Sequence, residues 1–386
     1  MRKVTPSCHP DNNNVEGGCL NLRADSCSLS DIKAIIHGLL VLLLLAAPAA
    51  VQAQFTYTTN ADGVSITITG YTGMGGAVAI PTNIDGLSVI NIGTNAFDGA
   101  TNLTSITIPA SVTNIGDYAF QACIGLTNVT IPGSVTTLGV HAFGFCITLA
   151  SVTIPEGVAS IGGYAFANSW DITNITISGS VTNIGGNAFF GSGLTSLAID
   201  SGLTSIGVTA FIDCESLTSV TIPGTVTNIE VNAFGDCYSL PSITIPASVT
   251  TLEDWAFEHC YSLTSAYFAG NAPTADLTVF SLDNVTVYYL PGTTGWGAFS
   301  TNTGLPTVLW NPLIQTGDGS FGLSNNEFGF NITGTTNIPI VVEACTDLAS
   351  PVWTPIQTLA LTNGLFHFRD SQWTNYPGRY YRISSP

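Results

Sequence analysis

The chain has 386 residues, of which 25 are acidic and only 7 basic, so its formal net charge is −18. Charged residues make up 8% of the sequence and apolar residues 45%, which argues against a disordered chain. No Lys or Arg occurs between positions 34 and 368, and because these side chains neutralise phosphate, nucleic acid and anionic membrane surfaces are poor candidate partners.

The N-terminal segment predicts export. Positions 38–50 read GLLVLLLLAAPAA, and the following Val51-Gln52-Ala53 suits the site where a signal peptidase cleaves. This apolar run is too short to span a bilayer comfortably, which takes about 20 residues. We therefore predict that residues 1–53 are a signal peptide with an over-long leader, and that the protein is extracellular or on the cell surface. A membrane anchor is the alternative.

Residues 54–95 are predicted to form an N-terminal cap. Phe55 to Thr59 and Val64 to Thr69 alternate apolar and polar side chains around Asn60-Ala-Asp-Gly63, which is the signal of a β-hairpin. The segment departs from the repeat that follows it, as the end units of repeat proteins often do.

An internal repeat dominates residues 96–268. The pair Ala-Phe recurs eight times at an almost constant interval of about 23 residues, and its Phe residues are Phe97, Phe120, Phe143, Phe166, Phe189, Phe211, Phe234 and Phe257. The interval from Phe189 to Phe211 is shorter by one, which places a deletion between Phe189 and Leu194, in a turn. A fixed period of this length predicts a solenoid, because one unit is too small to bury its own apolar side chains.

The first half of a unit reads as a strand. Leu126, Val129 and Ile131 are expected to face inward, and Asn128 and Thr130 outward, because side chains alternate across a β-strand.

The second half of a unit is expected to turn the chain back. Gly139 is expected to free the backbone for a turn, and Ala142 and Phe143 to close the unit in a short helical turn. Two other units carry Glu230 and Glu253 in place of this glycine, which indicates that the turn does not require a positive φ.

The unit resembles the BspA-like leucine-rich repeat of bacterial surface proteins, whose pattern is L-x-x-I-x-I-P-x-x-V-x-x-I-G-x-x-A-F-x-x-C. The resemblance extends from Leu103 to about Phe268, with Ser178 and Asp200 replacing the proline in two units. It implies a mainly β, right-handed leucine-rich repeat solenoid with eight units, and a role in adhesion or protein binding rather than catalysis.

Two further segments follow the repeats. Residues 269–310 are predicted to form a C-terminal cap, with short strands at residues 286–290 and 305–310. Residues 311–386 are predicted to form a small β-sandwich, because five short strand-like runs follow one another with turn residues between them. Their W-T-P…F-x-D…R-Y-Y-R pattern resembles a module that recurs on bacterial exported proteins.

Cysteines recur at the repeat period. The position three past each Phe holds, in chain order, Ala100, Cys123, Cys146, Ser169, Ser192, Cys214, Cys237 and Cys260. Exchange with Ala and Ser indicates a tight buried slot. Free thiols are therefore favoured over disulfides, because side chains in register on parallel units keep a Cβ separation slightly too wide for a bridge.

A polar column is expected near the C-terminal end of the repeats. Asp213, Asp236 and His259 stand at the second position past the Phe of three successive units. A divalent cation could relieve the repulsion of stacked carboxylates, but a solvated turn is the favoured interpretation. No cofactor, metal site or catalytic motif is predicted.

The outward face of the strands is the candidate binding surface. Its short, uncharged side chains are Asn128, Thr130, Ser151, Thr153, Asn174, Thr176, Ser219, Thr221, Ser242 and Thr244, and Tyr267 ends the row. Such residues also suit a strand for purely structural reasons. Ordered Thr rows resemble ice-binding solenoids as well, although sheet curvature would spoil that match.

These features predict a monomeric, exported, non-enzymatic protein whose strand face binds a protein or a glycan. The alternative is a structural surface component with no discrete ligand.

Overall fold

The computed structural model describes residues 54–324 and 326–385, so the predicted signal peptide lies outside the described part of the chain. About 35% of the described residues are in strands and 3% in helices, and the fold is mainly a β-solenoid of about 11 turns. This exceeds the eight repeats because strands before and after them continue the same stack.

The predicted N-terminal hairpin is confirmed. β1 (Phe55–Thr59) and β2 (Ser65–Tyr71) pair antiparallel. β2 then pairs in parallel with β5 (Leu87–Ile92), to which β4 (Asn83–Ile84) adds an antiparallel edge. β3 (Gly76–Ala79) pairs in parallel with the first repeat strand. The hairpin thereby covers the first unit, whose apolar side chains would otherwise meet water.

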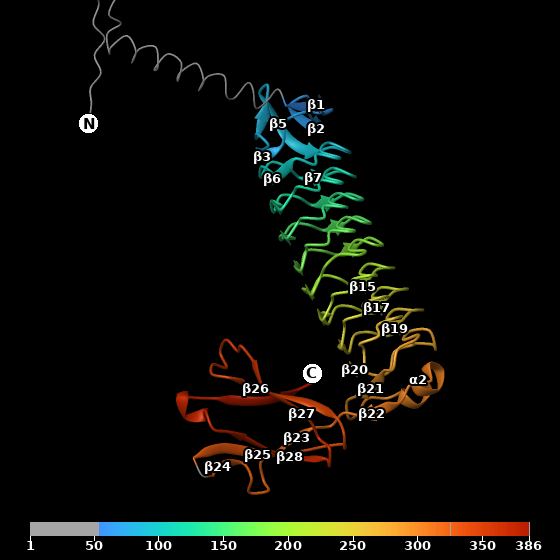
Figure 1. Cartoon of the computed structure of the whole chain (residues 1–386), viewed down its shortest axis with the longest axis vertical. Coiled ribbons are helices and arrows are strands. Elements are labelled where there is room, and N and C mark those ends of the chain that lie inside the picture. The colour runs from blue at the N-terminus through green and yellow to red at the C-terminus, as the bar shows by residue number, and fades with distance from the viewer. Residues whose placement is uncertain (1–53, 325, 386) are drawn as a thin grey trace, which may run out of the picture. The chain divides into compact units, whose positions relative to one another are not determined.

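The repeats stack as layers of short strands (Figure 1), and eight longer strands alternate along the chain with seven shorter ones. The longer strands are β6 (Leu103–Thr107), β8 (Asn128–Thr130), β10 (Ser151–Thr153), β12 (Asn174–Ile177), β14 (Ser196–Ile199), β16 (Ser219–Thr221), β18 (Ser242–Ile245) and β20 (Ser265–Phe268). The shorter strands are β7 (Asn114–Ile115), β9 (Thr137–Leu138), β11 (Ser160–Ile161), β13 (Asn183–Ile184), β15 (Ser205–Ile206), β17 (Asn228–Ile229) and β19 (Thr251–Leu252). Neighbouring strands of both sets pair in parallel with equivalent residues opposite each other, as Thr130 is to Thr107 and Thr153. The ladders are interrupted between β10 and β12, between β16 and β18, and between β13 and β15.

A ladder of phenylalanine rings runs through the core. The rings from Phe97 to Phe257, and then Phe280 in the unit beyond them, stack on one another with centroids 4.8 to 5.5 Å apart. They are almost completely buried. One ring per unit at an identical depth gives every unit the same core layer, which explains the strict recurrence of the Ala-Phe pair.

The turn around Ala142 and Phe143 is tight but not helical, which corrects the expected helical turn. His141 and Phe145 have positive φ angles, which a right-handed helix does not accept. Alternate N–H groups also point along the stack: the Phe143 N–H donates to Ala165 O in the next unit, 2.8 Å away. Bonds between units thus take the place of bonds within a helix.

Gly139 is needed for close packing rather than for backbone freedom. Its φ is not positive, so the expectation from Glu230 and Glu253 is confirmed. A Cβ on Gly139 would collide with backbone atoms of Gly116 and Asp117 in the preceding unit. The turn itself therefore does not require glycine, but in this unit the close approach of the preceding unit excludes a Cβ.

The solenoid continues past the repeats. β21 (Thr286–Tyr289) pairs with β20, and β22 (Thr307–Leu309) pairs with β21, both in parallel. The helix α2 (Trp296–Thr303) lies between them in the sequence, and its Trp296 and Phe299 are buried in the solenoid core.

The last segment forms two antiparallel sheets that share a core. One contains β23 (Leu313–Gln315), β24 (Gly322–Ser324), β25 (Glu327–Thr333) and β28 (Leu365–Asp370), and the other contains β26 (Pro339–Cys345), β27 (Thr354–Ala360) and β29 (Tyr380–Ser384). A short 3-10 turn, η1 (Trp373–Asn375), lies between β28 and β29 in the sequence. Phe330, Ile340 and Phe368 are buried together between the two sheets, as expected of a β-sandwich.

Candidate functional site

The strand face consists of the outward side chains of β8, β10, β12, β16 and β18, which the sequence analysis selected. Asn128, Thr130, Ser151, Thr153, Asn174, Thr176, Ser219, Thr221 and Thr244 are exposed, and Ser242 is half-buried. The residues between them, such as Val129 and Val152, are buried. The predicted alternation is therefore confirmed.

Parallel pairing arranges these side chains in two straight rows. Asn128 lies opposite Ser151, and Thr130 opposite Thr153, at the ~4.8 Å spacing of neighbouring strands. Within a row, the Ser196 hydroxyl donates to Asn174 Oδ1 at 2.5 Å. Ala198 interrupts the Thr row at β14. The face presents hydrogen-bond donors and acceptors without a charged group.

Tyr267 lies in register with Thr244 of this face, but other side chains cover it, which corrects its selection as an exposed binding residue. Its side chain is only 4% exposed. Its ring stacks on Tyr288 with centroids 5.0 Å apart and meets the edge of Trp310 at 6.2 Å. The next turns of the solenoid supply these rings, so Tyr267 stabilises the end of the stack instead of meeting a partner.

The side chains of the polar column are only partly hydrogen-bonded to one another and to their neighbours. His259 Nδ1 lies 3.0 Å from Asp236 Oδ1, and the Tyr238 hydroxyl donates to the same oxygen at 3.2 Å. Asp213 has no such partner among the described residues, and burial together with the charges of Glu215 and Asp236 raises its pKa. Among the described residues, no group of three or more His, Cys, Asp or Glu side chains has the arrangement of a metal site.

The cysteine slot holds free thiols. Cys123, Cys146, Cys214, Cys237 and Cys260 are buried and unbridged. Each donates a hydrogen bond to the carbonyl of the preceding unit's Phe, as Cys146 does to Phe120 O at 3.2 Å. Burial raises the pKa of Cys123 to about 12. These thiols are therefore packing groups and not nucleophiles.

One exposed aromatic residue was missed by the sequence analysis. Trp170 lies beside the shortened unit, and its side chain is 61% exposed. Two sequence signals could have found it: the fourth position past Phe holds no other Trp in the eight repeats, and the shortened interval follows directly.

The repeat pattern decides the family. The model of the BspA type leucine rich repeat region matches residues 82–195 and 182–306, which together span more than half of the chain. The chain belongs to the BspA-type leucine-rich repeat family. No curated protein matches it in sequence.

Several solved structures of bacterial leucine-rich repeat proteins are similar to this BspA-type chain. A leucine-rich repeat protein of T. pallidum is 31% identical, with a TM-score of 0.46, over 49% of this chain and 89% of its own. One from Bacteroides ovatus is 24% identical, with a TM-score of 0.49, over 67% of this chain and 75% of its own. A leucine rich cell surface protein of Faecalibacterium prausnitzii is 27% identical, with a TM-score of 0.38, over 67% of this chain and 93% of its own.

The described part of this BspA-type protein contains no helix of the length and apolarity needed to span a membrane. Bacterial surface proteins with such solenoids fit a binding or a structural role.

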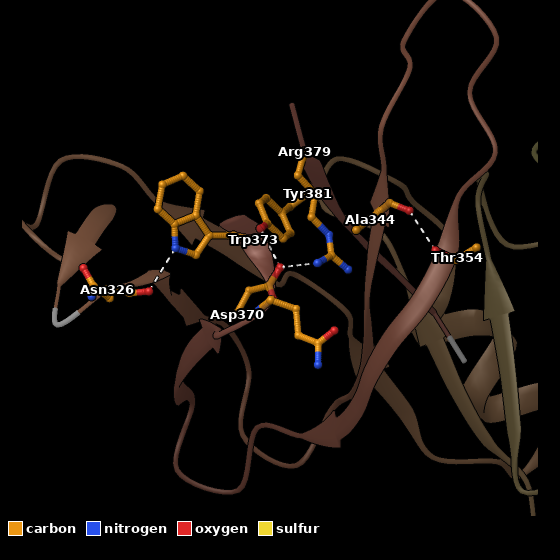
Figure 2. Close-up of polar contacts among 8 residues, drawn as sticks. Asn326, Ala344, Thr354, Asp370, Trp373, Arg379 and Tyr381 are labelled. Carbon is orange, nitrogen blue, oxygen red and sulfur yellow. Dashed lines mark hydrogen bonds and ion pairs between the residues drawn. The ribbon is translucent and has the colours of Figure 1, made fainter. Parts of the chain in front are cut away.

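The C-terminal sheets lie beyond the matched repeats, and the R-Y-Y-R pattern there has a structural reason (Figure 2). Asp370, which is 7% exposed, accepts a hydrogen bond from the Tyr381 hydroxyl at 2.7 Å and pairs with Arg379 at 2.8 Å. Thr354 of the W-T-P segment donates to Ala344 O at 3.1 Å. The pattern thus describes contacts that hold the module together.

Proposed function

We propose that this protein is an exported, non-enzymatic binding or adhesion protein that contacts a protein or a glycan through its strand face. One observation carries the proposal: the face is an exposed, in-register array of hydroxyl and amide groups with no charge on it.

The array suits recognition because its scaffold is already ordered. Most of the strand backbones are paired with a neighbour, so a partner that binds the face does not have to order the backbone first. Hydroxyl and amide groups both donate and accept, which matches the surface of a glycan or of a polar protein segment. Binding would be distributed over many weak contacts, because strong single anchors usually require Trp, Tyr or Arg.

The location of this role is also part of the proposal. The segment at residues 38–53 directs export, and removal of the predicted leader takes away equal numbers of acids and bases, so the exported chain keeps its charge of −18. A negatively charged solenoid with an uncharged strand face avoids anionic partners and leaves neutral polymers as candidates.

The test is binding of the chain beginning at Gln54 to protein and glycan arrays. The triple variant Thr153→Lys, Thr176→Lys and Thr221→Lys places three charges on the strand face and is expected to abolish the binding seen with the wild type. The matched control is Thr136→Lys, Thr182→Lys and Thr227→Lys. These threonines are also exposed, but each lies directly before a shorter strand (β9, β13 or β17) and not on the strand face.

Retention of binding in the strand-face variant, or its equal loss in the control, would contradict the proposal. A wild-type protein that binds nothing on either array would instead favour the structural surface component.

A further inference from the structure

A notch of about 310 Å³ lies at the shortened repeat unit, on the turns that precede β12, β14 and β16. Its lining includes Asn168, Trp170, Gly191, Gly193, Asp213 and Glu215. This volume is at the lower end of the ~300–1,000 Å³ that small-molecule sites enclose. The notch is separate from the strand face.

Two glycines of the shortened unit line the notch. The fourth position past Phe carries a side chain in the other seven repeats, namely Thr101, Ile124, Ile147, Trp170, Glu215, Tyr238 and Tyr261. The shortened unit has Gly193 there, and a Cβ on it would collide with the carbonyl oxygen of Trp170. Gly191, in the row two past Phe, has a φ of 60°, which favours glycine. The rows two and four past Phe therefore both lack a side chain at the same level of the stack.

The notch is a gap between two walls, one with Asn168 and Trp170 and the other with Asp213 and Glu215. Asn168 Oδ1 lies 3.0 Å, and Asp213 Oδ2 3.7 Å, from the position that a Cβ on Gly191 would take, so the two oxygens approach the gap from either side. The walls belong to units two strand spacings apart, roughly 9.6 Å. In the row four past Phe, the side chains of later units fill the corresponding space. The rings of Tyr238 and Tyr261 stack there with their centroids 5.4 Å apart.

The polar groups of the notch are free to bind. In the next two units, Asp236 is engaged by His259 and Tyr238. Among the described residues, by contrast, no side-chain hydrogen bond is made by Trp170 Nε1, the Asn168 amide or the carboxylates of Asp213 and Glu215. No aromatic ring of the described chain stacks on Trp170. One indole, one amide and two carboxylates are thus directed to a ligand or to water.

We propose that this notch binds one pyranose ring of a neutral saccharide. The apolar C–H face of the sugar packs on Trp170, because exposed indoles provide large, rigid apolar contact area. The sugar hydroxyls donate to Asp213, Glu215 and Asn168, and charge-assisted bonds of this kind are stronger than neutral ones. The carboxylates repel uronic acids, sialic acids and phosphates, which leaves uncharged sugars.

The test is ligand-detected saturation-transfer NMR on the full chain, with methyl glucopyranoside, methyl galactopyranoside and methyl mannopyranoside as probes at millimolar concentration. We expect signal transfer from at least one of them. Trp170→Ala is expected to raise the dissociation constant at least about tenfold, as the loss of an anchor residue does. Trp170→Phe keeps a ring and is expected to retain part of the affinity.

The matched control is Trp255→Ala, because Trp255 is also a partly exposed indole of the repeats, 40% exposed, but lies outside the notch. It should bind like the wild type, and so should the strand-face triple variant, which separates this site from the proposed function. Circular dichroism of every variant confirms that it is folded.

Three results would overturn the proposal. They are the absence of transfer from all three glycosides, unchanged binding in Trp170→Ala, and preferential binding of choline or lysine methyl ester, which would make the notch a cation site.

Discussion

The hydroxyl of Tyr381 in β29 donates to Asp370 Oδ2 at the end of β28, 2.7 Å away, and so joins the two sheets of the C-terminal module. The same oxygen pairs with Arg379, whose guanidinium lies over the Tyr376 ring, 4.4 Å from its centroid. A single carboxylate therefore supports both a hydrogen bond between the sheets and a nearly buried cation.

Substitution of Asp370 should destabilise the module strongly. In Asp370→Ala, the buried Arg379 loses its counter-ion and Tyr381 its acceptor, and we expect a loss of about 3–5 kcal/mol in the free energy of unfolding. Tyr381→Phe removes only one hydrogen bond to a charged group, for which about 1.5–3 kcal/mol is expected. Urea unfolding of the C-terminal module, followed by near-ultraviolet circular dichroism, measures both losses.

The control for this pair is Glu327→Gln, which breaks the exposed ion pair with Arg369. Exposed pairs contribute only about 0–1 kcal/mol. A loss in Asp370→Ala no larger than in this control would show that the Asp370 contacts are not needed for stability.

The phenylalanine ladder should be sensitive to the loss of one ring. Phe166 is fully buried and stacks on Phe143 at 5.5 Å and on Phe189 at 5.4 Å. Phe166→Ala is expected to cost about 3–5 kcal/mol because it removes a large side chain from a close-packed core. Calorimetry should show a lower Tm and a broader transition, since each unit of a repeat protein contacts only its neighbours. Phe145→Ala is the control, because that ring is exposed.

Stability should depend on pH through Asp283. Burial raises the pKa of this carboxyl to about 7, against the opposing effects of the Cys260 backbone and of His259. Between the ordinary carboxyl pKa of about 4 and pH 7, the folded state holds a proton that the unfolded state has lost, so stability falls as the pH rises through this window. Asp283→Asn should remove this slope and be more stable than the wild type at pH 8. Parallel Tm curves for the two proteins between pH 4 and pH 8 would contradict the assignment.

The cysteine slot should accept serine and stay unreactive. Ser169 occupies this slot in its own unit and donates to Phe143 O at 3.2 Å, as Cys146 does to Phe120 O. Cys146→Ser should therefore change the Tm little, whereas Cys146→Val adds a branched side chain to a closed space and should lower it. In the chain beginning at Gln54, a disulfide-exchange reagent at pH 8 should modify the repeat cysteines only after unfolding. Fast modification of the folded protein would show that the slot opens.

Much of the solenoid could be predicted from single residues and their spacing. The alternation of Val129 with Asn128 and Thr130 placed the strand face correctly, and the exchange of Cys123 with Ala and Ser placed the buried slot. Both are local properties, because the side-chain period of a strand and the depth of a slot are repeated within each unit.

The rest depended on neighbours that the local pattern does not specify. Tyr267 continues the outward row in the sequence, but the rings of later turns cover it. Gly139 looked like a turn residue, whereas backbone atoms of the preceding unit exclude its Cβ. The backbone N–H groups of His141 and Phe145 donate to carbonyls of the next unit, so the chain at Phe143 does not form the expected short helical turn.

The sequence by itself determined the repeat, the inward and outward faces and the family, because the period of the Ala-Phe pair and the alternation along each strand are written directly in the order of the side chains. Only the tertiary structure decided which exposed groups meet. Trp170 and Asp213 belong to units that are not consecutive, yet they line one notch, and Gly191 and Gly193 of the unit between them line it too. Such proximity arises from the stacking of units, and stacking depends on contacts that no single unit contains.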